Sequence, residues 1–143
     1  MSKKRNCGFS LVELLVVVAI IGALAAVGTV AYNGYVEGAR RSAAQNAMQQ
    51  IALMQTEHYS ISGGYYGKAT CDPSATGTSE INTTLFDTEA DEVVIEVENY
   101  EFCVQLEKED GVEVGFLVKS CNVQKSCPED EVLTLNSKGA NNF

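Results

Sequence analysis

The first third of the chain contains a long run of apolar residues. Residues 14–31 hold no charged side chain, and Thr29 is the only polar one among them. As an α-helix that rises about 1.5 Å per residue, this run would measure roughly 27 Å, which is close to the thickness of a bilayer core. The pattern predicts a membrane-spanning helix over residues 9–31. One acid, Glu13, lies near its start, although insertion scales give a cost of roughly 2.5–3.5 kcal/mol for a charge at mid-bilayer.

The apolar residues of the next segment follow a helical spacing. They recur at intervals of four and three residues, which places them on one stripe of a helix. The stripe consists of Ala44, Met48, Ile51 and Met54. We expect residues 32–60 to be the amphipathic continuation of the first helix, with this stripe packed on a small sheet. No proline interrupts the run, and the glycines at 63–64 predict where the helix stops.

Residues 61–143 are predicted to form a small globular head. The stretch 67–91 is rich in Ser, Thr and Gly and contains Pro73, so we expect a loop there. Strand-like patterns follow from about residue 92 to 137. The expected strands cover 93–98, 100–106, 112–118 and 131–136, and a turn at 108–111 joins the middle two as a hairpin. A helix followed by an antiparallel meander predicts the α+β class.

A short basic leader precedes the apolar run. The first eight residues, MSKKRNCG, carry three positive charges, and FSLVE follows them. Leader, junction and apolar run together resemble the class III signal of the type IV pilin family, and the resemblance extends over residues 3 to about 67. It implies a type IV pilin fold, cleavage by prepilin peptidase between Gly8 and Phe9, and methylation of the new terminal amine on Phe9. It also implies that Glu13 is the assembly residue, which pairs with the terminal amine of a neighbouring subunit.

Electrostatics independently supports a role for Glu13 in assembly. The amine freed at Phe9 and the N-terminal end of the helix dipole are both positive. In a bundle of apolar helices the amine and the carboxylate would lose their water, which is costly unless they pair. A wrong axial offset leaves them unpaired, so the pair would fix the register between helices. The alternative is an ordinary anchor helix with a stray acid, which leaves the Gly8-Phe9 junction unexplained.

Four cysteines remain after the leader, which contains Cys7. They are Cys71, Cys103, Cys121 and Cys127. An even number of cysteines in a small exported head predicts two disulfides. A zinc site is the alternative, but the spacing includes no C-x-x-C pair. Four cysteines allow three connectivities, and the sequence leaves all three open.

The balance of charge argues against nucleic acid as a partner. All 19 acids lie after residue 8, against 7 of the 10 bases, so this part has a formal charge of −12. Affinity for duplex DNA comes largely from cations that displace counterions from phosphate. DNA binding is therefore not expected of this head.

The sequence shows no constellation of catalytic residues, and no enzyme activity, cofactor or resident metal is expected. His58 is the lone histidine, and we interpret it as a packing or surface residue. The acids Asp87, Glu89, Asp91 and Glu92 raise the possibility of a calcium site, but without an EF-hand pattern a solvated acidic loop is favoured. Asn82-Thr83-Thr84 fits the short glycosylation pattern, which is weak evidence by itself.

The resemblance implies a structural polymer subunit. Such a chain is held in the bacterial inner membrane, processed by prepilin peptidase, and drawn by an assembly platform into an extracellular pilus of like or mixed pilins. These fibres serve adhesion, twitching motility or DNA uptake. Two alternatives stay open: a pseudopilin of type II secretion, and a minor tip pilin that acts as a binding module.

Overall fold

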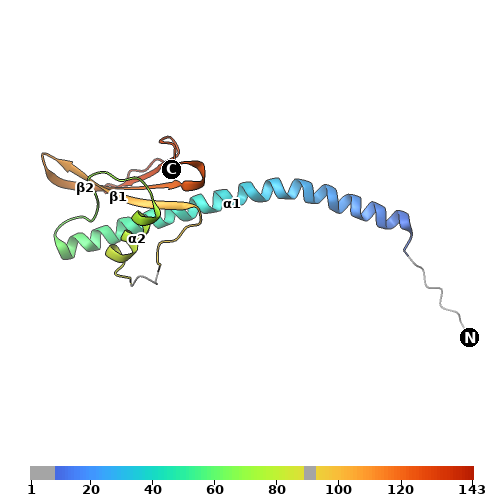
Figure 1. The fold of residues 1–143 in the computed structure, drawn as a ribbon, viewed down its shortest axis with the longest axis horizontal. Helices are drawn as coiled ribbons and strands as arrows, with labels where there is room; N and C mark the ends of the chain where they lie inside the picture. The colour runs from blue at the N-terminus through green and yellow to red at the C-terminus, as the bar shows by residue number, and fades with distance from the viewer. Residues whose placement is uncertain (1–8, 89–92) are drawn as a thin grey trace, which may run out of the picture. The chain divides into compact units, whose positions relative to one another are not determined.

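The computed structural model describes residues 9–88 and 93–143 (Figure 1). Helix α1, Leu11–Ser62, comes first, and the short helix α2, Ala75–Leu85, follows it. Strands β1, Tyr100–Glu109, and β2, Val112–Asn122, precede the 3-10 turn Val123–Lys125 and strand β3, Leu133–Asn136. The chain divides into two compact units, Met1–Gly38 and Ala39–Phe143, and α1 contributes to both. This order of elements confirms the predicted α+β class.

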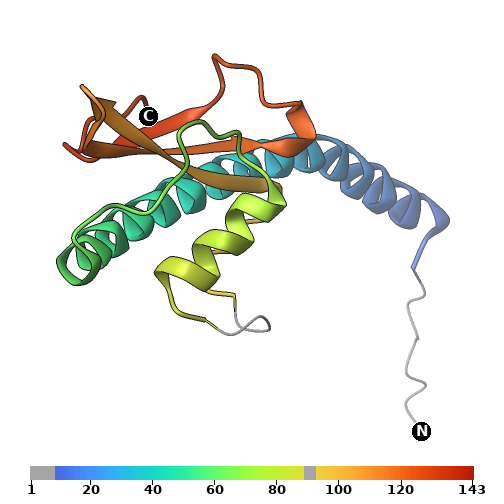
Figure 2. The same cartoon turned by 60° about the vertical axis from the view of Figure 1, so that its left-hand side comes forward.

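The C-terminal part of α1 supplies one side of the core of the second unit. Ala44, Met48 and Ile51 of the predicted stripe are fully buried, and Met54 is half-buried. They pack in one cluster with inward-facing strand residues such as Phe102 and Val118, which are also fully buried. Figures 1 and 2 show this part of α1 along one face of the sheet. Burial of each large aliphatic side chain contributes about 1.5–3 kcal/mol before the cost of ordering the chain.

The end of α1 lies where the glycine pair predicts it. Gly63 adopts a φ of 77°, and its amide donates to the carbonyl of Tyr59 over 2.9 Å. Such a left-handed residue satisfies one of the helix's last carbonyls. His58 lies in the final turns, with Nδ1 3.0 Å from the Gly64 carbonyl oxygen. The lone histidine therefore helps to close the end of the helix.

The expected hairpin is present as β1 and β2, and β3 adds to β2 in the order β1-β2-β3. Asp110 and Gly111 form its turn with φ values of 51° and 81°. Phe116 is buried, but Val112 and Val114 of the same strand are 66% and 50% exposed. The register shifts beside Glu107, so that Val114 has no cross-strand partner and the alternation of buried residues is broken near the tip.

The predicted loop over 67–91 is wrong in its middle, where α2 forms. The Ser74 side chain accepts a hydrogen bond from the Gly77 amide over 3.2 Å and caps the helix. Ile81 and Leu85, four residues apart, are buried in the core. A Cβ on Gly77 would lie 2.6 Å from the Phe102 carbonyl oxygen, so the glycine allows α2 to approach β1 closely. Packing and capping here outweigh the weak helix propensity of Ser, Thr and Gly.

Segment 68–74 and α2 cover the outer edge of β1. The Lys68 amide donates to the Val104 carbonyl, and the Leu106 amide donates to the Lys68 carbonyl, over 3.0 and 2.8 Å. The Phe102 amide donates to the Thr78 hydroxyl over 2.9 Å. An edge strand with satisfied backbone groups does not recruit foreign strands.

The predicted strand over 93–98 is also wrong. Its only β contact among the described residues is the bridge between Val97 and Tyr100. The Asn82 side chain, 4% exposed, instead accepts from the Val94 and Ile95 amides over 3.0 and 2.7 Å. Its amide nitrogen donates to the Thr78 and Ile95 carbonyls. These bonds replace strand pairing, and they bury the side chain on which the glycosylation pattern depends.

Candidate functional site

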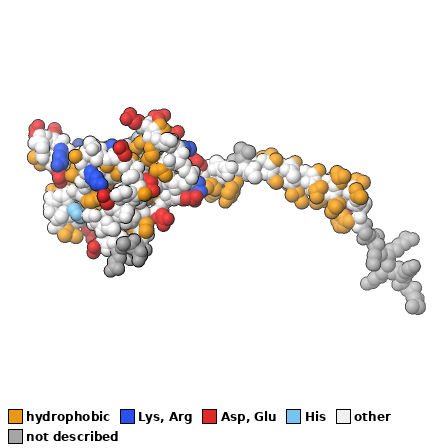
Figure 3. Space-filling view, in the orientation of Figure 1, with side chains coloured by type: hydrophobic (Ala, Val, Ile, Leu, Met, Phe, Trp, Pro, Cys, Tyr) orange, Lys and Arg blue, Asp and Glu red, His pale blue; other side chains and the backbone are white. Residues whose placement is uncertain are grey.

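The N-terminal part of α1 is apolar and uncovered. Between residues 11 and 27 the large hydrophobic side chains are 46–79% exposed, from Val17 at the low end to Leu11 at the high end. An 18-residue window of this helix has a mean hydropathy of 2.7 and is 0% buried, so the helix is long and apolar enough to cross a membrane. Figure 3 shows orange side chains along the visible face of this segment. Soluble single chains rarely expose so large an apolar surface, which marks it for lipid or for other helices.

Glu13 is tied into the first turn of α1. The Ser10 amide donates to the Glu13 carboxylate over 3.0 Å, and the Glu13 amide donates to the Ser10 hydroxyl over 3.2 Å. This reciprocal pair is a capping box, which satisfies two amides that a helix start leaves free. Ser10 is the residue that the sequence reading missed. The S-x-x-E spacing before an apolar run was the available signal.

The helix start places the candidate groups close together in the chain. Phe9 is 81% exposed, and Glu13 lies in the first turn of the helix that follows. The carboxylate is exposed, and its hydrogen-bond partner among the described residues is the Ser10 amide of its own turn, so an incoming cation can reach it. Gly8, the other side of the expected cleavage junction, lies outside the described residues. The arrangement offers an anionic group at one end of an uncovered apolar rod.

The head brings its four cysteines together in two pairs. Cys71 pairs with Cys103 across 32 positions, with a Cα–Cα distance of 6.1 Å, and Cys121 pairs with Cys127 across 6 positions, with a Cα–Cα distance of 5.4 Å. Of the three possible connectivities, the structure thus has the one that joins the loop before α2 to β1. On the chain-entropy model the longer loop contributes about 3–4 kcal/mol.

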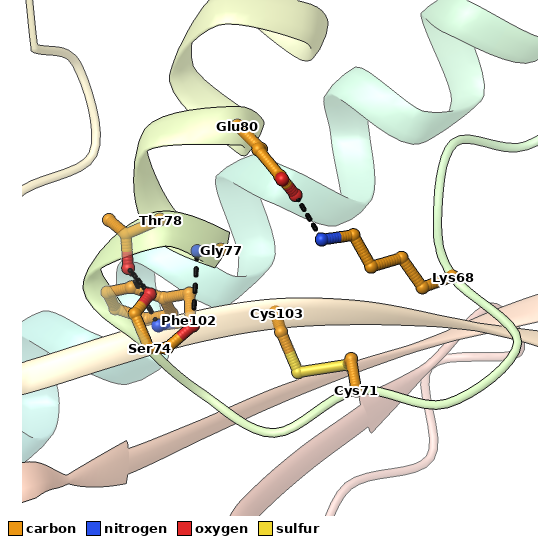
Figure 4. Close-up of a disulfide and its surroundings, with 8 residues drawn as sticks. All are labelled: Lys68, Cys71, Ser74, Gly77, Thr78, Glu80, Phe102 and Cys103. Atoms are coloured by element: carbon orange, nitrogen blue, oxygen red, sulfur yellow. Dashed lines mark hydrogen bonds and ion pairs between the residues drawn. A yellow bond between two sulfur atoms is a disulfide. The ribbon is translucent and has the colours of Figure 1, made fainter.

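An ion pair crosses from the start of the head to α2 near the first disulfide. Lys68 Nζ lies 2.6 Å from the Glu80 carboxylate, and both point toward one another above the Cys71–Cys103 bond in Figure 4. Glu80 raises the pKa of Lys68 by accepting a hydrogen bond from it. Burial, and then the charge of Glu80, raises the pKa of Tyr66.

The possible calcium site lies mostly outside the residues that the structure describes. Glu89, Asp91 and Glu92 lie outside the described residues, and only Asp87 of the four acids is among them. Within residues 9–88 and 93–143, no three His, Cys, Asp or Glu side chains are grouped so as to hold a metal ion.

A long helix with an uncovered apolar first half, followed by a small antiparallel sheet, defines the class of the molecule. Comparison with known proteins specifies it further. Residues 3–29 match the family model of the prokaryotic N-terminal methylation motif. The chain is 34% identical over 86 residues to the prepilin peptidase-dependent protein D of Escherichia coli (strain K12), which covers 60% of this chain and 56% of that protein. It is 41% identical over 63 residues to the fimbrial protein EcpC of Eikenella corrodens, covering 44% of this chain and 41% of that one.

These matches confirm the resemblance seen in the sequence: residues 3–29 carry the prokaryotic N-terminal methylation motif, the class III signal of type IV pilins, and the chain is similar to proteins named as prepilin peptidase-dependent and fimbrial. Its long helix and three-stranded antiparallel sheet are consistent with the type IV pilin fold. The chain spans about half the length of the curated relatives that it matches. No solved structure matches it.

Proposed function

We propose that the chain is a structural subunit of a type IV pilus. Prepilin peptidase cleaves it between Gly8 and Phe9, and the new amine of Phe9 is methylated. The subunit waits in the bacterial inner membrane, and an assembly platform then moves it into an extracellular polymer of like or mixed pilins. Adhesion and twitching motility suit the acidic head better than DNA uptake, because polyanions are repelled by its charge. We assign no catalytic role to the chain.

The uncovered first half of α1 is the observation that carries this proposal. Leu14, Ile20 and Leu24, spread along this half, are 61%, 55% and 68% exposed. A helix apolar on every side is stable only where lipid or other apolar helices surround it. A bilayer and the core of a helical polymer both require a helix with an apolar surface. The same helix can therefore anchor the chain in the membrane and later pack inside the polymer. Contacts between copies that do not close into a ring then generate a helical fibre.

Glu13 supplies the register of that fibre. In the single chain its carboxylate accepts a bond from its own helix start, over 3.0 Å from the Ser10 amide. A charged amine on a neighbour offers a stronger, charge-assisted partner. Because both charges lose water inside a helix bundle, an offset that pairs them is favoured over every offset that does not.

The proposal is tested by Glu13→Gln. Glutamine at this position of a capping box still bonds the helix start, so the substitution removes the charge and keeps the cap. We expect normal membrane insertion and a yield of sheared surface filaments that falls by about tenfold or more, which corresponds to at least 1.4 kcal/mol of lost pairing. Glu57→Gln is the matched control, since Glu57 is an exposed acid on the same helix but in the head.

Two results would contradict the proposal. One is an unchanged filament yield for Glu13→Gln with the chain normally processed. The other is an equal loss for Glu57→Gln, which would trace the defect to net charge rather than to register. If export of other proteins stops while surface pili persist in a strain without this chain, the pseudopilin alternative holds instead. If pili persist and only surface attachment is lost, the tip-pilin alternative holds.

A further inference from the structure

A groove with a mixed polar and apolar lining lies between β1, α2 and the segment that carries Cys71. Its volume is about 500 Å³, within the range of small-ligand sites. The Lys68–Glu80 pair and the Cys71–Cys103 disulfide both line one wall of it, and Figure 4 shows this ion pair and this disulfide. Its polar lining also includes Thr70, Gln105 and Lys119. Disulfide and ion pair hold the wall together, so the groove is formed before any ligand arrives.

Lys119 is the distinctive residue of this groove. It lies in the middle of β2, paired with Cys103 of β1 and Thr134 of β3, on the sheet face opposite the α1 core. Its side chain is half-buried and lines both this groove and an adjoining one of about 350 Å³. Arg40, Lys68 and Lys108 form ion pairs, whereas Lys119 forms none with the described residues.

A half-buried lysine side chain that forms no ion pair with the described residues is unusual in so acidic a molecule. Partial loss of water disfavours a cation unless an anion compensates it. The nearby Gln105 side chain is also half-buried and makes no hydrogen bond to the part of the chain that the structure describes. A cation and an amide that are both left to solvent in one groove suit a ligand with a carboxylate and neutral hydroxyl groups.

The surrounding acids limit the ligand to a single negative charge. Asp72 lines both grooves beside Lys119, and Glu129 lines the second. A second anionic group on the ligand would meet these carboxylates. More distant acids of the head matter less, because physiological salt screens exposed charges over about 8 Å. A polyanion is therefore rejected where a monoanion is accepted.

We propose that this groove binds a saccharide unit that carries one carboxylate, as uronic acids do. The ammonium of Lys119 anchors the carboxylate. The Gln105 amide and the hydroxyl of Thr70 bond the ring hydroxyls, and the half-buried Tyr66 provides an aromatic surface at the wall. The site belongs to the head and goes beyond the proposed role in assembly, so neither claim depends on the other.

The test titrates D-glucuronate into the full chain in non-ionic detergent micelles, with ligand-observed NMR as the readout. Variant Lys119→Gln removes the anchor, and Lys138→Gln removes an exposed lysine that lines neither groove, so both change net charge equally. We expect saturable binding to the wild type and to Lys138→Gln, and a dissociation constant raised about tenfold or more in Lys119→Gln. Lys119→Arg should retain most of the affinity. Matching thermal midpoints would show that the variants are folded.

Neutral and small probes sharpen the outcome. Glucose should bind at least about tenfold more weakly than glucuronate, because it lacks the anchored group. Acetate should also bind more weakly than glucuronate, because it has no ring hydroxyls to bond the Gln105 amide and the Thr70 hydroxyl. The proposal is overturned if wild type does not bind glucuronate, if Lys119→Gln binds as wild type does, or if glucose or acetate competes equally. Loss of binding in Lys138→Gln would overturn it as well, since it would reduce the effect to overall charge.

Discussion

The two halves of helix α1 differ in the burial of side chains of the same kind. Ile51 in the second half is fully buried against the sheet, whereas Ile20 in the first half is 55% exposed. The second half has an apolar stripe with polar residues opposite, and the sheet and α2 already cover that stripe. The first half is apolar on all sides, and its most apolar 18-residue window is 0% buried among the residues that the structure describes. One half of the helix builds the head, and the other half is left for the contacts with lipid or other helices that we propose.

The polar residues of the two halves show the same contrast. Gln55 is fully buried, donating to the Tyr66 carbonyl and accepting from the Tyr66 amide over 2.8 and 3.0 Å. It holds the chain that leaves α1 against the helix. Glu13 is exposed, and its bond to the Ser10 amide can be exchanged for a charged partner. A buried polar group with both ends satisfied is structural, while an exposed acid at the start of an apolar helix is free to make the assembly contact that we propose.

The largest expected effect comes from making the same substitution in both halves. We expect Ile51→Ala to reduce the free energy of unfolding of the head by about 2–5 kcal/mol, since it removes fully buried methylenes. Ile20→Ala should leave it within about 0.5 kcal/mol. Near-ultraviolet circular dichroism of the full chain during urea unfolding in micelles measures both. Equal losses would show that the head and the first half of the helix are not energetically separate.

A smaller loss is expected when the Asn82 bonds are removed. Asn82→Ala leaves the Val94 and Ile95 amides without their acceptor, at a combined cost of about 2–4 kcal/mol. Asn46→Ala, at an exposed position of α1, is the control and should change stability by no more than about 0.5 kcal/mol. The same unfolding experiment serves for both. Should the two variants match, segment 93–95 would not depend on Asn82 for its position.

The smallest expected effect is an alkaline loss of stability at the Lys68–Glu80 pair. The pKa of Lys68 is raised above its ordinary value of 10.5, and that of Tyr66 above 10.0, so both groups hold their protons more tightly in the folded chain. Their contribution is therefore complete below about pH 10 and is lost as pH rises through the raised values.

Thermal midpoints of wild type and Lys68→Met measure this contribution. The difference between them should be small and constant from pH 7 to pH 9, and it should shrink toward zero above the folded pKa of Lys68. Lys138→Met controls for the loss of one exposed charge. A difference that grows with pH in this range would contradict the assigned sign.

Much of the fold followed from local patterns in the sequence. The apolar run, the stripe through Met48 and the glycine pair at 63–64 predicted α1, and alternation around a turn predicted the β1–β2 hairpin. These signals are local, because helix and hairpin partners lie near one another in the chain. Helix α2 was missed because its composition favours a loop, and its stability depends on packing Ile81 against distant residues. The strand expected at 93–98 failed because the Asn82 side chain takes the amides that a neighbouring strand would use.

The candidate sites show the same difference between local signals and contacts formed only in the folded chain. The roles of Gly8, Phe9 and Glu13 could be predicted from the sequence, since the motif is contiguous and each residue type has a separate physical reason, and these roles stay predictions. The groove around Lys119 could not be predicted, because β1, β2, α2 and segment 68–74 meet there only in the folded head. Pairing of the cysteines was open for the same reason.

The central claim is that the apolar first half of α1, once the leader is removed, packs against copies of itself or other pilins to form the core of a filament. The most direct test is the intact mass of this chain in filaments sheared from the cell surface. The account predicts a chain that lacks residues 1–8 and carries one added methyl group on Phe9. Recovery of the chain only from membranes, with residues 1–8 still attached, would contradict the claim.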